Sequence, residues 1–302
     1  MSAALELIDA HQHFWDPFAN DYPWLRPEAR LPFRYGDYAA LKRRYLPADY
    51  RADAAAHRVV ATVHVEAEWS QADPAGETRW LAALRARAGL PSVAVAQAHL
   101  DREDVAEVLA AQARFDFVRG IRHKPAAAPG PREVRRGAPG SMEDERWRRG
   151  YALLARHGFS FDLQVPWWHL AEAAQLARDF PATQIIINHI GLPADRSEAG
   201  IAAWRTALAL VAAEPNVALK ISGLGLPGRA WRIEENAPVV REAIAILGIE
   251  RAMFASNYPV DSLVASFDTI FSGFKAITAD RPPEERRKLF RDNAQRVYRI
   301  VL

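Results

Sequence analysis

Two histidines separated by one residue follow the first apolar segment of the chain. Residues 5–10 have the composition of a strand, and His11 and His13 come directly after them. Side chains of an extended chain alternate between faces, so these two imidazoles are expected on the same side. Two convergent imidazoles can bind one metal ion or polarise one substrate oxygen. A lone His-x-His also fits an ordinary strand end, so the choice between a functional site and a strand end depends on the rest of the chain.

Short β-branched segments alternate with amphipathic helical stretches along the whole chain. We predict strands at 5–10, 59–67, 92–99, 117–123, 159–165, 184–189, 217–222 and 252–256. We predict helices at 77–88, 102–113, 143–157, 170–179, 200–213, 237–247, 263–279 and 283–301, with Asp101 and Ser262 as N-caps. This alternation predicts a single (β/α)8 TIM barrel domain over residues 1–302. A doubly wound sheet is disfavoured, because no Gly-x-Gly-x-x-Gly turn follows the first strand.

Polar residues lie at the carboxyl end of every predicted strand. They are His11 and His13, His64 and Glu66, Gln97 and His99, Arg122 and His123, Asp162 and Gln164, Asn188 and His189, Lys220 and Ser222, and Asn257. In a barrel these ends share one face, where barrel active sites are built. Histidines from five of the strands would meet there. The sequence therefore predicts a functional site on this face.

Composition narrows the possible classes of protein. The 302 residues are 50% hydrophobic and 25% charged, enough for a full core. The net charge is only +2, and basic and acidic residues are interleaved. The charge therefore gives no reason to expect that the protein binds nucleic acid. The absence of cysteine excludes disulfides, Cys-ligated zinc and a thiol nucleophile. Residues 1–4 lack a basic leader and no apolar run reaches membrane-spanning length, so we expect a cytoplasmic monomer or homo-oligomer without membrane partners.

Two long connections leave the predicted functional face. Residues 16–49 carry many aromatic residues among prolines, which favours an ordered, packed loop. Residues 124–145 are rich in Pro, Gly and Arg, which favours a mobile or partly disordered flap. Both follow polar strand ends, so both are expected to cover the site.

Seven motifs, in order, resemble the amidohydrolase superfamily. They start at Ile8 (IDAHQHFWD), Asp21 (DYPW), Tyr45 (YLPADY), Val118 (VRGIRH), Asn188 (NHIG), Lys220 (KISGL) and Met253 (MFASNYPV). The resemblance is to the lactonase-like branch, which includes L-fuconolactonase, L-rhamnonolactonase, sulfomuconolactonase and pyrone-dicarboxylate lactonase. It covers nearly the whole chain and implies a barrel hydrolase acting on a small-molecule lactone.

The resemblance implies a metal site that this chain matches only in part. The superfamily generally uses the first-strand His-x-His and histidines on the fifth and sixth strands, and here His11, His13 and His189 correspond. The fifth strand carries Asp162 in place of a histidine. His11, His13 and His189 could hold one Zn²⁺ or other divalent metal, with Glu66 as an extra oxygen ligand. Some members of the branch work without metal, so metal-independent action stays open.

Asn257 is the main departure from the superfamily pattern. An aspartate in this place takes a proton from the hydrolytic water, and a neutral amide cannot act as that base. Glu66, with Asp162 second, is the replacement that we expect. The alternative for Glu66 is a salt bridge to Arg122. His123 is a further candidate acid or base, or a residue that orients Arg122.

We therefore predict a hydrolase that opens a lactone of a sugar acid or related carboxylated molecule. Its expected catalytic residues are His11, His13, Glu66, His189 and Asn257, and its expected substrate-binding residues are Arg122, His123, Asp162, Gln164, Trp15 and Ser222. Arg122 suits a substrate carboxylate because its guanidinium donors lie in one plane. Two rivals remain. One is a metal-dependent decarboxylase of the same superfamily, and the other is a non-catalytic protein that kept the binding pocket.

Overall fold

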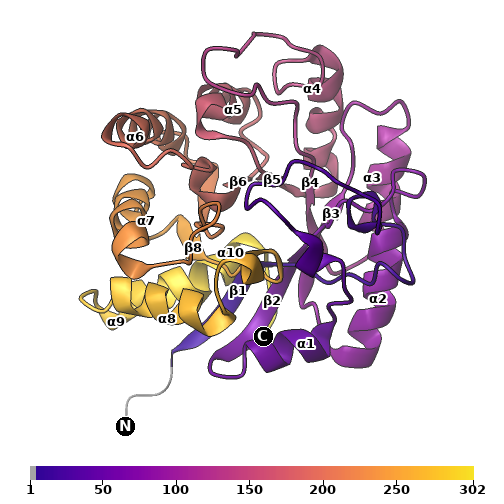
Figure 1. The fold of residues 1–302 in the computed structure, drawn as a ribbon. Coiled ribbons are helices and arrows are strands. Elements are labelled where there is room, and N and C mark those ends of the chain that lie inside the picture. Colours follow the sequence, from indigo (N-terminus) through magenta and orange to yellow (C-terminus); the bar gives the residue numbers. More distant parts are fainter. Residues whose placement is uncertain (1–4) are drawn as a thin grey trace.

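The computed structural model describes residues 5–302, in which eight parallel strands form one sheet (Figure 1). The expectation for residues 1–4 lies outside the described residues. Each strand pairs with the next in chain order. The strands are β1 (Glu6–Gln12), β2 (Arg58–Val65), β3 (Val93–Gln97), β4 (Val118–Arg122), β5 (Ser160–Leu163), β6 (Ile185–Ile187), β7 (Val217–Ile221) and β8 (Ala252–Phe254). All eight lie within the segments predicted from the sequence, to within two residues at their ends.

The sheet closes where the residues after β8 meet the end of β1. The Asn257 amide donates to the carbonyl of His11 at 2.8 Å, and the His13 amide donates to the carbonyl of Tyr258 at 2.7 Å. Helices surround the strands in a ring (Figure 1). The predicted (β/α)8 barrel is thus confirmed, and its closing contacts lie at the carboxyl ends of the strands.

Helix α1 (Pro47–Asp53) is not among the predicted helices, and the other helices follow the predicted order with some shifted ends. The other helices are α2 (Gly76–Ala88), α3 (Val105–Ala113), α4 (Glu145–Ala152), α5 (Leu170–Asp179), α6 (Glu198–Ala212), α7 (Ile233–Leu247), α8 (Phe267–Ile277), α9 (Pro283–Arg287) and α10 (Asn293–Val297). The predicted N-caps Asp101 and Ser262 are wrong. Ser262 lies in a 3-10 turn, and Ser266 caps α8 by accepting from the Thr269 amide, because only there does the chain enter the helix. The last predicted helix is split by a π-helical turn, Lys288–Asp292.

Two hydrophobic clusters hold the barrel. The larger cluster lies between the strands and the surrounding helices. The smaller fills the barrel interior with residues such as Ile8, Val63, Ile186 and Met253, and α10 and Tyr298 pack against it. Side chains that alternate along each strand therefore supply both layers. The polar strand ends rest on this packed interior.

The connection 16–49 is ordered and packed, as predicted. Tyr22, Tyr38 and Tyr45 are buried, and the Trp24 indole donates to the carbonyl of Ala67 at 2.8 Å. This ties the loop to the chain that leaves β2.

The connection 124–145 differs from the expected mobile flap, because several hydrogen bonds anchor it. The Ala126 amide donates to the carbonyl of Gly140 at 2.8 Å, and the Ala128 amide donates to His169 Nε2 at 2.9 Å. The Trp168 indole donates back to the carbonyl of Ala128 at 3.0 Å.

Among residues 5–302, no helix combines the length and apolar character needed to span a bilayer.

Candidate active site

Three histidines meet at the carboxyl end of the barrel. The ring centroids of His11 and His13 lie 5.0 Å apart, and those of His11 and His189 lie 4.7 Å apart. All three rings are buried. The structure therefore brings the predicted first-strand pair together with the histidine that follows β6.

Neighbouring groups fix the orientation of two of these rings. His13 Nδ1 lies 2.6 Å from the carbonyl oxygen of Val65, and a carbonyl only accepts, so Nδ1 carries the proton and Nε2 keeps its lone pair. His189 Nδ1 lies 2.9 Å from the Ser222 hydroxyl. Both nitrogens of His11 are buried without a hydrogen-bond partner. The site thus offers imidazole nitrogens that a ligand could engage.

Burial and nearby cations keep the three imidazoles neutral. Burial is the main cause that lowers the pKa of each ring well below its ordinary value of 6.5. The strongest cationic contribution comes from Lys220 at His11, from Arg122 at His13 and from Arg34 at His189. At neutral pH these rings can therefore accept a proton or a metal.

The backbone around His189 turns sharply to aim its ring. The predicted strand to residue 189 ends at Ile187, because His189 and Ile190 adopt left-handed conformations with φ of 55° and 48°. Such conformations are costly for non-glycine residues and cluster at functional sites. Gly223 leaves room for this arrangement, since a Cβ there would lie 2.6 Å from His189 Nδ1.

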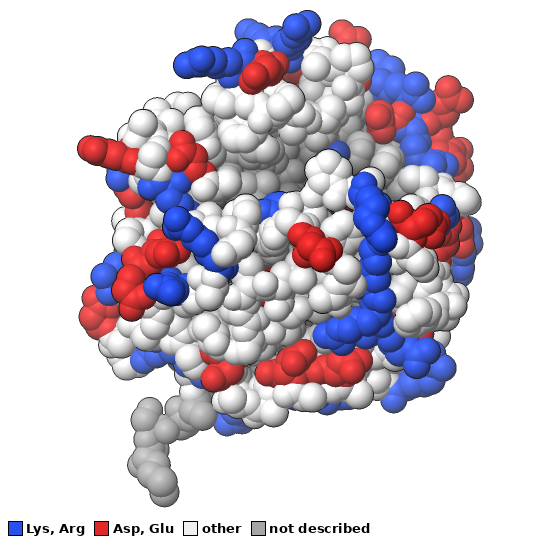
Figure 2. Space-filling model, in the orientation of Figure 1, with Lys and Arg blue, Asp and Glu red and all other residues white. Residues whose placement is uncertain are grey.

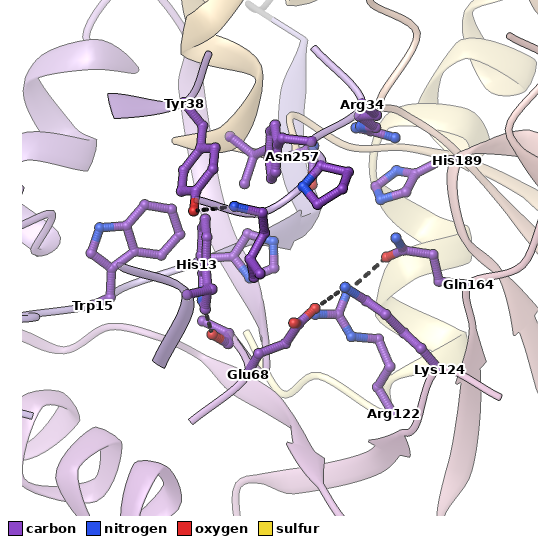
Figure 3. A pocket seen from close by; sticks show the side chains of 16 residues that line it. His13, Trp15, Arg34, Tyr38, Glu68, Arg122, Lys124, Gln164, His189 and Asn257 are labelled. Atoms are coloured by element: carbon purple, nitrogen blue, oxygen red, sulfur yellow. Dashed lines mark hydrogen bonds and ion pairs between the residues drawn. The ribbon is translucent and has the colours of Figure 1, made fainter. Parts of the chain in front are cut away.

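A pocket of about 240 Å³ opens beside His13 and His189 (Figure 3). Trp15, Trp24, Phe33 and Tyr38 form its aromatic side, and its polar lining comprises Arg34, Glu68, Arg122, Lys124, Gln164 and Asn257. The space-filling view shows this face hollowed, with charged side chains gathered mainly toward its periphery (Figure 2). Of the residues predicted to bind substrate, Trp15, Gln164 and Arg122 lie in this lining, whereas Ser222 lies behind His189.

Arg122 and Glu66 form a buried ion pair. Arg122 Nε donates to Glu66 Oε1 at 2.5 Å, and Arg122 Nη1 donates to Gln164 Oε1 at 3.2 Å. The other carboxylate oxygen of Glu66 accepts from the Glu68 amide at 2.7 Å. The structure therefore shows the salt bridge that the sequence left as an alternative, and both oxygens of Glu66 are engaged.

Asp162 lies beneath the pocket rather than in its lining. Its carboxylate is fully buried and accepts from Lys220 Nζ at 2.5 Å, Asn188 Nδ2 at 2.9 Å and the Tyr298 hydroxyl at 3.0 Å. Burial is the main cause that lowers the pKa of Lys220 to about 8. Asp162 thus holds Lys220, the charged residue that contributes most to lowering the pKa of His11.

A third buried carboxylate, Asp261, organises the residues around Asn257. Its Oδ1 accepts from Asn257 Nδ2 at 2.6 Å, from the Tyr35 hydroxyl at 2.9 Å and from Arg34 Nη2 at 3.3 Å. Arg34 Nη1 has no hydrogen-bond partner. In Figure 3 the Arg34 side chain lies next to His189 at the edge of the pocket. Sequence reasoning missed Arg34 and Asp261, because neither belongs to a strand-end motif.

His123 lies outside this pocket, in an adjoining chamber. Its ring stacks on His99 with centroids 4.4 Å apart and an interplanar angle of 19°. Its Nδ1 accepts from the Leu100 amide at 3.1 Å and from the Trp147 indole at 3.0 Å. The chamber lies next to the pocket, and Arg122 lines both.

The residues present fit a divalent metal in part. His11, His13 and His189 have the donor chemistry that Zn²⁺ prefers. Within residues 5–302, however, only His99, Asp101 and His123 place three ligand atoms all within 4.8 Å of one another. That spacing is compatible with a divalent metal, although two hydrogen bonds already occupy His123 Nδ1. The three buried histidines are more widely spaced than a closed three-ligand site.

Comparisons with known proteins agree with this geometry. The amidohydrolase family model matches residues 8–300. The protein y4mH of Sinorhizobium fredii is 40% identical over 98% of this chain and 99% of its own length. L-fucono-1,5-lactonase of Burkholderia ambifaria is 30% identical over 97% of this chain and 95% of its own length. A zinc-bound amidohydrolase crystal structure from Burkholderia multivorans superposes with a TM-score of 0.80 at 27% identity, covering 98% of this chain and 99% of that one.

The barrel and its strand-end histidines define an amidohydrolase. The chain belongs to the amidohydrolase family, and its relatives include proteins named as lactonases.

Proposed function

We propose that this protein is a hydrolase that opens the lactone of a small hydroxylated acid. The observation that carries the proposal is the group of neutral, buried imidazoles beside a pocket of about 240 Å³. The similarity of the chain to L-fucono-1,5-lactonases over nearly its full length supports a cyclic ester as the substrate.

In this proposal His13 accepts the proton of the attacking water. Its Nδ1 is held by the carbonyl of Val65, which also stabilises the ring once it is protonated, and its Nε2 is free. The water oxygen adds to the lactone carbonyl carbon to form a tetrahedral oxyanion. The bond to the ring oxygen then breaks, and the proton held by His13 passes to that oxygen, which leaves as a hydroxyl. The product is the open hydroxy acid.

Arg34 is the proposed donor to the oxyanion or to a nearby substrate oxygen. Its Nη1 is unpartnered, and Asp261 holds its Nη2 from behind. A preorganised donor next to developing negative charge commonly contributes about 10²–10³ in turnover. Arg122 is restrained by Glu66 and Gln164, so we assign it to the wall that positions the substrate. Glu66 then serves to hold Arg122 rather than to activate water.

A divalent metal stays within the proposal. His11, His13 and His189 would hold it, and it would supply Lewis-acid polarisation of the lactone carbonyl. The roles of His13 as proton acceptor and as metal ligand exclude each other, so metal analysis separates them.

The test is a screen of aldonolactones with a pH indicator, using protein purified without chelator and measured for metal content. We expect proton release on ring opening, and we expect His13→Ala to remove it while the thermal melting midpoint stays close to that of the parent. Activity that a chelator abolishes and zinc restores would assign His13 to the metal. If no lactone is opened, and substrate carboxylates instead release CO₂, the protein is a decarboxylase.

A further inference from the structure

A chamber of about 410 Å³ adjoins the pocket that we assign to the lactone ring. Trp24, Glu68, Arg122 and Lys124 line both spaces, so the two lie next to each other. The chamber is the larger of the two and therefore has room for a further unit of similar size. Nothing in the proposed hydrolysis uses it.

His123 presents a fixed hydrogen-bond donor to this chamber. Its Nδ1 accepts two hydrogen bonds, from the Leu100 amide and the Trp147 indole, so Nδ1 has no proton. A neutral imidazole with an unprotonated Nδ1 carries its proton on Nε2. His123 Nε2 is therefore a donor that calls for an acceptor, and it is unsuited to bind a metal.

Gln97 lines the chamber from the neighbouring strand, and its amide oxygen is buried in the chamber wall. Its Nε2 donates to the carbonyl of Trp69 at 3.0 Å, which sets the orientation of the amide, because a carbonyl cannot donate to Oε1. The residue is 3% exposed, and its Oε1 has no hydrogen-bond partner. Gln97 pairs with Arg122 in the register of β3 and β4, so it lies at the junction of the two spaces. A buried acceptor left without a donor is costly unless a ligand supplies one.

We propose that this chamber is a second subsite, which binds a hydroxyl-bearing unit of the substrate beyond the lactone ring. A hydroxyl both donates and accepts, so the hydroxyl groups of a sugar have the chemistry that Gln97 Oε1 and His123 Nε2 each require. Trp24 and Trp69 also line this chamber, and aromatic side chains suit the apolar face of a sugar ring. The inference rests on the proposed function, because it places the reacting ring in the first pocket.

The test compares two lactones that differ by one sugar unit. The substrates are gluconolactone and the disaccharide lactone cellobionolactone. The key variant is His123→Asn, because the asparagine carbonyl can still accept from Leu100 and Trp147 while the Nε2 donor is lost. Gln97→Met removes the acceptor at similar side-chain length. His157→Asn is the control, since His157 precedes β5 at the opposite end of the barrel.

We expect each subsite variant to raise KM for cellobionolactone about three- to tenfold, the loss of one hydrogen bond, with kcat unchanged. KM for gluconolactone should not change in either variant, and His157→Asn should change neither substrate. Equal effects on both lactones, or none on cellobionolactone, would overturn the second subsite.

Calorimetry separates the subsite from the proposed hydrolysis. The open acids gluconate and cellobionate are titrated into each protein. If no lactone is turned over but cellobionate binds more tightly than gluconate, and His123→Asn removes the difference, the subsite stands and the proposed hydrolysis fails. The chamber is instead a metal site if Zn²⁺ binds to the parent and both His99→Ala and His123→Asn abolish that binding.

Discussion

Asn257→Asp should destabilise the protein in a pH-dependent way. Asn257 Nδ2 donates to Asp261 Oδ1 at 2.6 Å, so the substitution replaces a donor with a second carboxylate at hydrogen-bond distance. Two unit charges 2.6 Å apart repel by about 6 kcal/mol at an effective dielectric constant of about 20, and by about 4 kcal/mol after relaxing to about 4 Å. One carboxyl can instead keep a proton, which near pH 7 also costs about 4 kcal/mol. We therefore expect a loss of about 4 kcal/mol in the free energy of unfolding at pH 7.

The sign of the pH dependence follows from proton binding. Burial already raises the pKa of Asp261, and a second carboxylate would raise it further. The folded variant then binds more protons than the unfolded chain between about pH 4 and the raised pKa, so its stability falls as pH rises through that window. The difference in the free energy of unfolding between parent and variant should shrink by about 1.4 kcal/mol for each pH unit below 7. It should be nearly gone near pH 4.

Urea unfolding at pH 4.5, 6 and 8 measures this deficit. The matched control is Asn257→Asp with Asp261→Asn, which exchanges the amide and the carboxylate and should recover most of the loss. A single variant as stable as the parent at pH 8 would show that the amide does not donate to Asp261 and would refute the reasoning.

His189→Ala should lower kcat by two or more orders of magnitude with little change in thermal melting, because its ring lines the pocket beside His13, where we place the reacting lactone; unchanged kcat would contradict that placement. Arg122→Lys should raise KM more than it lowers kcat, since lysine loses the planar donors, and steady-state kinetics on a neutral and an anionic lactone should show the larger effect on the anion. Lys220→Met should lower the free energy of unfolding, measured with urea, by about 3–5 kcal/mol, because it leaves Asp162 as a buried charge without its cation. A plot of kcat/KM against pH should be flat from pH 8 to 6.5 and fall only under more acidic conditions, where His13 becomes protonated; an acid limb centred above 6.5 would contradict the lowered pKa.

The sequence predicts the scaffold of the site better than the pairing within it. Strand periodicity and polar strand ends were enough to place His11, His13 and His189 at one barrel mouth. The partners of the polar groups depend on contacts between distant segments, which no local pattern encodes. Arg34 reaches the site from the long loop after β1 and meets Asp261, a partner 227 residues away along the chain. Such a pair leaves no periodic signal. The predicted cap Ser262 is likewise wrong, because the chain enters α8 only at Ser266.

The charges around the imidazoles explain why the site can lack a free carboxylate base. The three cations that lower the histidine pKa values most each have a buried carboxylate partner: Arg34 with Asp261, Arg122 with Glu66, and Lys220 with Asp162. These pairs keep the cations from being buried alone, and the cations in turn help to lower the histidine pKa values. Every one of these carboxylates is engaged in holding a cation, so none is available to take a proton from water. An aspartate at position 257 would add a negative charge beside Asp261, whereas the amide of Asn257 donates a hydrogen bond to the Asp261 carboxylate. The same arrangement that excludes a carboxylate base keeps the imidazoles neutral, which is the state in which His13 can accept a proton.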